Sequence, residues 1–450
     1  MTKTYLRIGF IALALTYTLG ISAKNNSLPG SGTDDEPYLI SSYSDLKLIA
    51  NDLTSVYSLT ADIDAAASLN ENSGAGWSPL GTSSTSSFSG KLFGHGHVIS
   101  NLFINLPLAT TGSNVGLFGY IAAATIDSVG VTSANITGNS NVGSLIGFSN
   151  GGTITHSFST GSVTGASYVG GLIGFTNASA TSYSYSTAAV NVATTGGGGL
   201  VGSNNYASTI NYSYSTGKVT GTGTSTAIVG GLVGFLGGTV SNSYSKSEIA
   251  NGVDQVGGLV GTAFSNPMGA KSSILNSYSV GKVNGTAASI GGLVGSNPVP
   301  LTTVTNSYWD KEASGKPASV LGVGKTTAEL KLSSTFTLWD FTNTWKIDTK
   351  NAGYPYLAWQ TFNTSTGLSA TKSSINLAVF NSANGFSVKV NNIDKFQGAK
   401  LNIYSIVGKL ISQTVLTEQI TDVQIGKGQY IGSVITKTGE KESFKVSVTK

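Results

Sequence analysis

A short glycine phrase recurs seven times between Val115 and Gly295, and it limits the possible folds more than any other feature. It joins an aliphatic residue, one or two glycines, two apolar residues and a closing glycine, as in Val229-Gly230-Gly231-Leu232-Val233-Gly234. The closing glycines are 28, 27, 28, 32, 27 and 34 residues apart. A period of this size is typical of stacked supersecondary units rather than of one globular core.

A second register lies between the glycine phrases and has the period of a strand. An apolar residue is followed two positions later by Asn, Tyr or His and four positions later by an aromatic residue, with serines between them. Because alternate residues of a strand face opposite sides, this triplet should face one side and the serines the other. We favour the core for the triplet; an outward face would instead make Tyr and Ser the contacts of a partner. The aromatic residues form a predicted ladder of Phe158, Tyr185, Tyr214, Tyr244, Tyr278 and Tyr308. Five positions after the aromatic residue, successive copies carry Val163, Val190, Val219, Ile249 and Val283.

Each unit has one apolar stripe that it cannot bury alone, whereas units coiled on one another stack like side chains. We therefore predict an all-β chain that is mainly a parallel β-solenoid with 27–34 residues per coil. At the usual strand spacing of about 4.8 Å, seven coils make a rod roughly 30 Å long. Residues 43–50 suit a short helix that covers the first coil, and the coils themselves are expected to begin within residues 88–104.

Composition and the N-terminus indicate export. The chain has no Cys, 10% charged residues and a net charge of +4, which is too small and too dispersed to imply nucleic acid. Lys3 and Arg7, an apolar run over 8–19 and Ile21-Ser22-Ala23 predict a signal peptide over residues 1–23. The run is too short for a spanning helix, so we expect no transmembrane segment in the mature chain.

The tail differs in kind from the repeats. Alternating apolar residues at 386–390, 401–404, 423–425, 430–431 and 444–448 predict a small antiparallel β-sandwich. The expected division is signal peptide 1–23, N-terminal cap and first coils 24–104, solenoid repeats 105–310, C-terminal cap 311–366 and β-sandwich 367–450.

The repeats resemble a known family. The glycine phrases, with Asn276-Ser277-Tyr278-Ser279 and Gly281-Lys282-Val283-Asn284-Gly285 as one full copy, resemble the GLUG repeat of bacterial surface proteins. The closing segment, which includes Asn306-Ser307-Tyr308-Trp309-Asp310 and Gly353-Tyr354-Pro355-Tyr356-Leu357, is similar to the way such arrays end. The resemblance covers about residues 30–359. It implies a right-handed parallel β-helix in exported, often adhesin-like proteins, and no single activity.

The tail resembles the C-terminal sorting domain of type IX secretion cargo. The likeness rests on residues 401–409, on Gly428-Gln429-Tyr430-Ile431 and on the basic end from Lys445 to Lys450. It implies that outer-membrane secretion machinery reads this tail.

Half of the predicted solenoid lacks any strong acid or base. No Asp, Glu, Lys or Arg occurs from Ser128 to Gly217, and Arg7 is the only arginine of the chain. Lyases and hydrolases built on β-helices need a base or paired carboxylates on neighbouring coils. His156 takes a position that holds Asn in later copies, so we assign it to a side-chain ladder rather than to a site.

Two short motifs also have structural interpretations. His95-Gly96-His97 could supply two metal ligands, but no carboxylate or Cys cluster accompanies it. Gly324-Lys325-Thr326 is similar to part of a phosphate loop, but Ser319 occupies the position of the earlier glycine that such a loop needs. We therefore expect no catalytic residues, no cofactor and no metal.

Acidic and Trp residues gather in the closing segment. Trp309, Asp310, Trp339 and Trp345 are possible ligand contacts, although cap packing is the favoured interpretation. We predict a non-enzymatic, exported β-solenoid at the outer-membrane surface or outside the cell, acting as an adhesin-like binding or structural scaffold. Its partner would be a glycan, extracellular matrix or a host protein. The alternatives are a β-helix polysaccharide lyase or hydrolase, or a carbohydrate-binding protein.

Overall fold

A computed structural model of the chain divides it into two compact units, Met1–Gln360 and Thr361–Lys450, close to the boundary expected at 366/367. The residues it describes are 27–106, 113–205, 207–223, 227–252, 254–265, 271–285, 289–360, 377–382, 385–390, 398–405, 409–417, 420–425, 428–435 and 441–448. The predicted signal peptide lies outside these residues.

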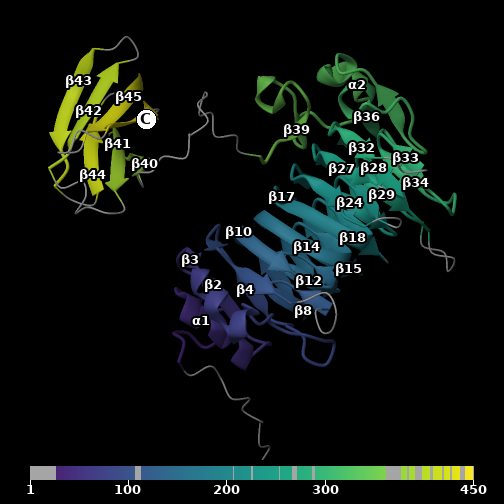
Figure 1. Cartoon of the computed structure of the whole chain (residues 1–450), viewed down its shortest axis with the longest axis horizontal. Coiled ribbons are helices and arrows are strands. Elements are labelled where there is room, and N and C mark those ends of the chain that lie inside the picture. The colour runs from purple at the N-terminus through teal and green to yellow at the C-terminus, as the bar shows by residue number, and fades with distance from the viewer. Residues whose placement is uncertain are drawn as a thin grey trace, which may run out of the picture. The chain divides into compact units, whose positions relative to one another are not determined.

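The first unit is a parallel β-solenoid, as the repeats predict, in which three sheets are stacked coil on coil (Figure 1). Sheet A is ten-stranded: β1 (Tyr38–Ile40), β2 (Val56–Leu59), β4 (Lys91–Phe93), β9 (Thr125–Asp127), β13 (Thr153–Thr155), β16 (Ala180–Ser182), β20 (Thr209–Asn211), β25 (Thr239–Ser241), β30 (Ser273–Leu275) and β35 (Thr303–Thr305). Sheet C is seven-stranded: β8 (Phe118–Ala122), β12 (Ile146–Asn150), β15 (Ile173–Asn177), β19 (Val201–Asn205), β24 (Val233–Leu236), β29 (Val260–Ala263) and β34 (Val294–Ser296).

Sheet B completes each coil. Its strands are β3 (Ile63–Asp64), β5 (Val98–Ser100), β6 (Phe103–Asn105), β7 (Ser113–Val115), β10 (Gly130–Thr137), β11 (Ser140–Val142), β14 (Phe158–Gly170), β17 (Tyr185–Ser186), β18 (Ala189–Gly198), β21 (Tyr214–Ser215), β22 (Val219–Gly221), β23 (Ile228–Gly230), β26 (Tyr244–Ser245), β27 (Ile249–Gly252), β28 (Gln255–Gly257), β31 (Tyr278–Ser279), β32 (Val283–Gly285), β33 (Ser289–Gly291), β36 (Tyr308–Asp310) and β37 (Val323–Lys325). The chain runs from sheet C through A to B and then into the next coil.

Strand pairing confirms the repeat register. Successive partners in sheet C are Phe118, Ile146, Ile173, Val201, Val233, Val260 and Val294. Their spacings of 28, 27, 28, 32, 27 and 34 residues are those of the closing glycines. The aliphatic residues five positions after the ladder rings, from Val163 to Val283, are buried in the core.

The glycine phrase forms the corner between sheets B and C. In the copy at 229–234, β23 ends at Gly230 and β24 begins at Val233. A Cβ on Gly230 would collide with the carbonyl oxygen of Val233, and one on Gly231 with that of Gly258 in the next coil. Glycine is required here because backbone approaches backbone. Leu232 between the two strands is buried, as is its equivalent in the other copies.

The solenoid begins earlier than expected. Sheet A starts at β1, about fifty residues before the predicted first coils at 88–104. The expected cap helix is present as α1 (Tyr43–Leu48), extended by the short 3-10 helix η1 (Ile49–Asn51). Ser42 caps α1 by accepting from the Asp45 N–H, and Leu46 is fully buried. Two further 3-10 turns follow, η2 (Ala66–Asn70) and η3 (Asn72–Gly74).

The C-terminal cap follows β36 and consists of short elements. They are α2 (Lys311–Ser314), the 3-10 helices η4 (Glu329–Lys331), η5 (Ser333–Thr335) and η6 (Thr349–Asn351), and the antiparallel pair β38 (Trp345–Lys346) and β39 (Tyr356–Leu357). Lys325, which the sequence placed in a false phosphate-loop match, is the last residue of strand β37. Within the described residues, no helix is both long and apolar enough to cross a membrane.

The second unit is antiparallel, as predicted for the tail. One sheet has the order β40 (Leu377–Ser382), β41 (Gly385–Val390) and β44 (Ile420–Gln424). The other has the order β43 (Leu410–Val415), β42 (Lys400–Ser405), β45 (Gly428–Ile435) and β46 (Lys441–Val448). β41 of the first sheet contacts β46 of the second. The sequence pattern missed β40 and β43.

Candidate functional site

A left-handed residue follows the strands of sheet A and sets the direction of the side chains after it. Its φ is 49° at His156, 50° at Tyr183 and Tyr212, 44° at Asn242 and Asn276, and 47° at Asn306. This conformation costs an L-residue roughly 1–2 kcal/mol and is most readily adopted by Gly, Asn and Asp. The chain turns outward at this residue, so strict alternation is lost.

The expected facing of the triplet is therefore wrong for its last two members. Ile154 is buried in the core, but His156 is exposed and Phe158 is half-exposed. Ser157 between them is fully buried. Alternation predicts the reverse because it assumes an unbroken strand, whereas β13 ends at Thr155 and β14 begins at Phe158.

The inward serines form a hydrogen-bonded ladder. The N–H of Ser157 donates to Ser184 Oγ at 3.1 Å, and Ser184 N–H donates to Ser213 Oγ at 3.2 Å. The pattern continues through Ser243, Ser277 and Ser307. Each bond satisfies a buried N–H at the corner, which explains why this position carries serine.

The predicted aromatic ladder exists as a column of parallel rings on the outside of the coils. Ring centroids are 4.9 Å apart for Phe158–Tyr185, 4.8 Å for Tyr185–Tyr214, and 5.1 Å for Tyr214–Tyr244 and Tyr244–Tyr278. Tyr308 pairs with Tyr278 in the strand register. Offset stacking of this kind stabilises the column by about 0.5–1.5 kcal/mol per pair beyond burial.

The C-terminal cap folds back over the later part of this column. Tyr244 is 1% exposed, Tyr278 0% and Tyr308 7%. Phe336, Trp339 and Trp345 pack against these rings. The cap also bonds to the column through Gln360 Nε2, which donates to Tyr244 Oη at 2.8 Å, and Tyr278 Oη, which donates to the Pro355 carbonyl.

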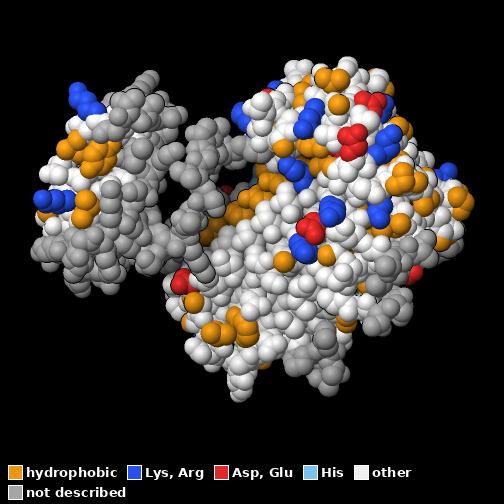
Figure 2. Space-filling model, turned by 45° about the horizontal axis from the view of Figure 1, so that its top comes forward, with side chains coloured by type: hydrophobic (Ala, Val, Ile, Leu, Met, Phe, Trp, Pro, Cys, Tyr) orange, Lys and Arg blue, Asp and Glu red, His pale blue; other side chains and the backbone are white. Residues whose placement is uncertain are grey.

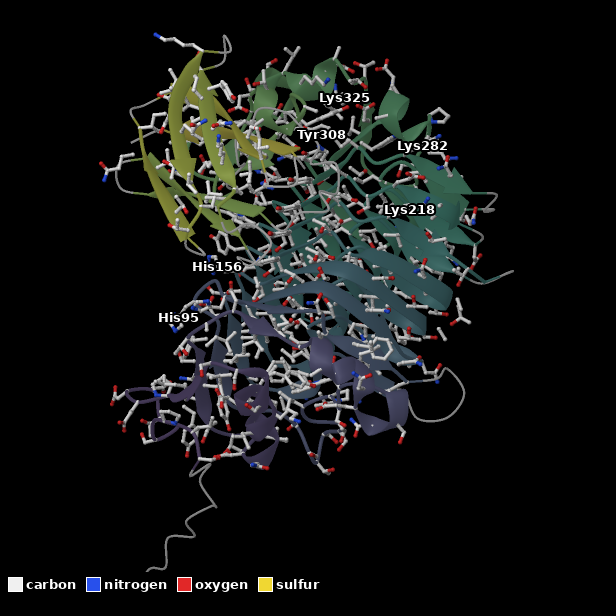
Figure 3. All side chains as sticks on the ribbon, turned by 60° about the vertical axis from the view of Figure 1, so that its left-hand side comes forward. His95, His156, Lys218, Lys282, Tyr308 and Lys325 are labelled. Carbon is white, nitrogen blue, oxygen red and sulfur yellow. The ribbon has the colours of Figure 1, made fainter. Side chains whose placement is uncertain are left out.

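The earlier part of the column is the candidate site. We call it the aromatic strip: it comprises the rings of His156, Tyr183 and Tyr212 in one column and those of Phe158, Tyr185 and Tyr214 in the next. The first column is stacked at 5.0 and 4.9 Å. All six side chains are exposed or half-exposed. In the described residues, the hydroxyls of Tyr183, Tyr185 and Tyr212 have no hydrogen-bond partner. Figure 3 labels His156 in the strip and Tyr308 in the covered part.

Asp127 and Trp359 lie at the two ends of the strip. Asp127 Oδ1 is 3.2 Å from His156 Nδ1 and also accepts from Thr155 Oγ1. Burial acts to raise the pKa of Asp127, but hydrogen bonds from Thr155, Ser128 and His156 outweigh it and hold that pKa below its usual range. At the other end, Trp359 donates from Nε1 to the Tyr212 carbonyl at 3.0 Å, and its ring lies 6.1 Å from that of Tyr183 at 73°.

Apart from Asp127 and His156 at one end, the strip and its surroundings carry no charged side chain between residues 128 and 217. The outward residues of sheet A beside the strip are mostly hydroxyl or amide residues, among them Thr155, Ser182 and Asn211. Wide areas of the solenoid in Figure 2 accordingly show neither charged nor apolar side chains. Apart from the His156–Asp127 pair at one end, such a surface offers ring edges and neutral hydrogen-bonding groups.

The residues offered by the sequence as ligand contacts are instead buried, Trp309 and Asp310 in strand β36 of the last coil and Trp339 and Trp345 inside the cap. Trp309 and Trp339 are 5% and 7% exposed and donate to the carbonyls of Lys316 and Asn306, both at 3.0 Å. Trp345 is fully buried, 4.3 Å from the Trp339 ring. This arrangement agrees with cap packing and goes against a ligand-contact role.

Asp310 is a structural anchor of the cap. It is fully buried, and its Oδ1 caps α2 by accepting from the N–H groups of Glu312 and Ala313. Its Oδ2 accepts from Thr327 Oγ1 and Tyr354 Oη, both at 2.7 Å. Both carboxylate oxygens therefore bond to groups of the same chain, and these bonds hold the cap together.

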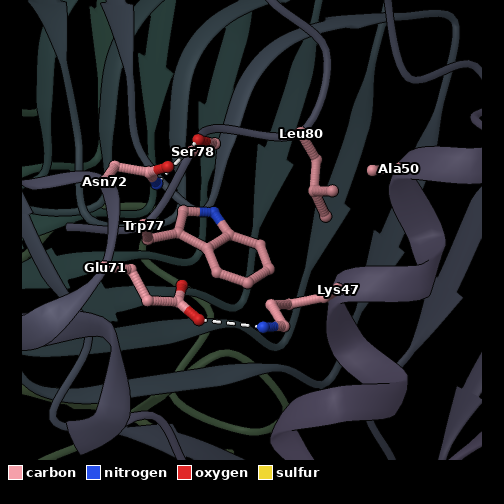
Figure 4. A pocket seen from close by; sticks show the side chains of 7 residues that line it. All are labelled: Lys47, Ala50, Glu71, Asn72, Trp77, Ser78 and Leu80. Atoms are coloured by element: carbon pink, nitrogen blue, oxygen red, sulfur yellow. Dashed lines mark hydrogen bonds and ion pairs between the residues drawn. The ribbon is translucent and has the colours of Figure 1, made fainter. Parts of the chain in front are cut away.

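A pocket of about 370 Å³ lies at the N-terminal end, between α1 and the turns after η2 (Figure 4). Its polar groups are paired with one another. Glu71 accepts from Lys47 Nζ at 2.8 Å and from Tyr43 Oη at 2.7 Å, and Trp77 Nε1 donates to the Leu117 carbonyl at 3.0 Å. With its carboxylate neutralised and its indole N–H satisfied, the pocket offers little to a substrate.

His95 and His97 form two separate pairs. His95 Nε2 is 2.9 Å from Ser58 Oγ, and His97 Nδ1 is 3.0 Å from Asp62 Oδ1. His95 and Gly96 have positive φ, so the motif forms a turn. The Ser58–His95 contact was not predicted; no carboxylate among the described residues bonds to His95, as a triad would need. No three candidate ligands in the described residues could share a metal ion.

Comparisons with known proteins give local sequence matches and a likeness of fold. No family model matches the chain. "Halomucin" of Haloquadratum walsbyi is 39% identical over 167 residues, which are 35% of this chain and 2% of that protein. "Putative Gly-rich membrane protein" of Evansella cellulosilytica is 34% identical over 119 residues, which are 26% of this chain and 13% of that protein. The chain thus matches only a small part of each relative.

A solved structure has the same fold. It is named "putative immunoglobulin A1 protease from Bacteroides ovatus" and aligns with a TM-score of 0.50 at 23% identity. The alignment covers 74% of this chain and 95% of that one. At this identity the likeness concerns the parallel β-solenoid alone.

Proposed function

We propose that the chain is an exported, surface-associated β-solenoid that acts as an adhesin-like binding or structural scaffold and not as an enzyme. The observation that carries this proposal is the aromatic strip, in which equivalent rings repeat from coil to coil on a surface whose one described carboxylate, Asp127, lies at its end. A repeated, rigid and neutral surface suits contact with an extended partner, whereas catalysis needs groups placed once and tuned in pKa. The names of the two relatives support a location at the cell envelope.

The described carboxylates support the non-enzymatic part of the proposal. Asp310 caps a helix, Glu71 pairs with Lys47, and Asp127 binds Thr155 and His156. The mature full-length chain should release no product from neutral or uronic polysaccharides. Cleavage of either class would overturn this part of the proposal. So would cleavage of immunoglobulin A1 that is lost in Ser58→Ala, since Ser58 and His95 are the described pair most similar to a nucleophile and base.

Export and sorting form the second part of the proposal. The predicted signal peptide, the resemblance to GLUG-repeat proteins and the resemblance of the tail to type IX sorting domains support it. Protease treatment of intact cells should degrade the full-length protein, while a periplasmic marker stays intact. Deleting residues 367–450 should leave the protein inside the envelope. Unchanged surface exposure after that deletion would refute the sorting role of the tail.

A further inference from the structure

We propose that the aromatic strip and the adjoining outer face of sheet A bind a neutral, extended polysaccharide that lies along the solenoid axis. This inference rests on the proposed scaffold function and names its partner. It concerns the strip from His156 to Tyr214, not the part of the column that the cap covers.

The first argument is repetition. Rings in the strip recur at 4.8–5.0 Å along the axis, one per coil in each of two columns. Thr155, Ser182 and Asn211 pair in register beside them at the edge of sheet A. A polysaccharide repeats the same groups along its length and can use every coil, so weak contacts add through multivalency. The surface of a globular, non-repetitive protein has no such repeat.

The second argument is chemical. A neutral sugar chain carries C–H groups and hydroxyls, and the strip offers aromatic rings beside Tyr, Ser, Thr and Asn groups. Tyr gives large contact area at low entropic cost, while Ser and Asn supply adaptable hydrogen bonds. No Lys or Arg occurs from Ser128 to Gly217, so an acidic polysaccharide would find no counter-charge along these coils.

The third argument comes from the backbone. The ladder position that holds Asn242, Asn276 and Asn306 in later coils holds Tyr183 and Tyr212 in the strip, with the same positive φ. Asn suits this conformation and Tyr does not, so the repeat keeps two strained aromatic residues in the coils where the rings remain half-exposed. Stacking compensates part of this strain, and polysaccharide binding accounts for Tyr at these two positions.

Continuity with the cap supports the same face. Trp359 of the cap already lies against Tyr183, Tyr185 and Tyr214, with its ring tilted 39–73° to theirs. The stacked rings thus accept a flat, mostly apolar group across their edges at one end of the strip. A sugar ring placed in the same way would meet His156 and Phe158, the rings of the strip for which no contact with Trp359 is found among the described residues.

The test uses the mature full-length chain and a double variant, Tyr183→Asn with Tyr212→Asn, which installs the residue found at this position in later coils. The matched control is Phe148→Ser with Phe175→Ser, since Ser203 takes this position in the next coil of sheet C. Phe148 and Phe175 also form a stacked column, at 4.9 Å, but lie away from the strip. Binding is measured to mannan, mixed-linkage β-glucan, dextran, polygalacturonate and heparin.

We expect binding to at least one of the three neutral polysaccharides, weakened tenfold or more in the Tyr variant and less than twofold in the control. Absence of binding to all three, equal loss in both variants, or preference for the polyanions would overturn the proposal. So would capture of collagen or fibronectin that depends on Tyr183 and Tyr212 without glycan binding. If cells that display the Tyr variant still attach normally, this inference fails and the scaffold function stands. If the wild-type chain never reaches the cell surface, the scaffold function fails by itself.

Discussion

One column of stacked rings is half-exposed in its earlier part and buried in its later part. Tyr185–Tyr214 and Tyr244–Tyr278 stack almost alike, with interplanar angles of 1° and 12°. Yet Tyr278 is completely buried, whereas Tyr185 is half-exposed. The difference arises from the cap, which within the described residues covers the later coils and reaches the strip with Trp359. The repeat therefore determines the stacking of the rings, and a non-repeating segment determines which of them are available to a partner.

The largest expected contrast is at alkaline pH. Burial raises the pKa of Tyr244 and Tyr278 far above the usual value of about 10. A raised folded-state pKa gives stability that is complete below pH 10 and is lost as pH rises further, because the unfolded chain then releases the proton first. Each such tyrosine costs up to about 1.4 kcal/mol per pH unit above 10.

We expect the free energy of unfolding of the first unit, measured in urea, to fall steeply between pH 10 and 12. In a double variant, Tyr244→Phe with Tyr278→Phe, the free energy of unfolding should fall less steeply with pH over this range, whatever its value at pH 8. An unchanged slope would mean that the cap does not exclude water from these rings.

Truncation of a ring should separate the two parts of the column next. Tyr278→Ala leaves a cavity under the cap and should lower the free energy of unfolding by about 3–5 kcal/mol. Tyr185→Ala, in the strip, removes stacking with two neighbours but leaves little cavity, so its loss should be about 1–2 kcal/mol. Thermal and urea unfolding measure both. Equal losses would contradict the division into covered and exposed parts.

The anchor of the cap gives a smaller effect. Asp310→Ala removes the N-cap of α2, worth about 0.5–2 kcal/mol, and leaves Tyr354 Oη without its acceptor. We expect a loss of roughly 2–3 kcal/mol. Limited proteolysis should cut between residues 311 and 360 before it cuts the coils. Asp340→Ala is the control, since this carboxylate is exposed and accepts from its own turn; its loss should be smaller. Simultaneous cutting of coils and cap in Asp310→Ala would show that they unfold together.

The architecture was predictable because the residues that determine it recur at equivalent positions of each coil. The glycine phrase, the buried aliphatic residues from Val163 to Val283 and the ring ladder need only a period and a register, and the coils pair in that register. The facing of the rings was not predictable from alternation, because a single left-handed residue such as His156 or Asn242 reverses it. Asn at this position was the available signal, since Asn often adopts positive φ.

The cap shows a different limit. Its residues occur once, so no period reveals that Trp339 and Trp345 turn back onto Tyr278 rather than into solvent. The site was missed for the same reason: the strip is defined by where the cap ends. The Ser58–His95 pair joins residues 37 apart, on strand β2 and in the turn before β5, which single-sequence patterns do not bring together.

The smallest expected effect on stability is also the most discriminating. Tyr183→Asn removes stacking with His156 and Tyr212, a loss of about 1–2 kcal/mol, but it relieves left-handed strain of similar size. The two terms oppose each other, so unfolding should change by less than about 1 kcal/mol in either direction. The reverse change in the later coils, Asn276→Tyr, adds left-handed strain at this position. Its neighbours in the column are Asn and cannot stack with the new ring, so the change should destabilise the chain. If Tyr183→Asn instead lost several kcal/mol, the strip would be a structural element of the rod, and its rings would need no partner to explain them.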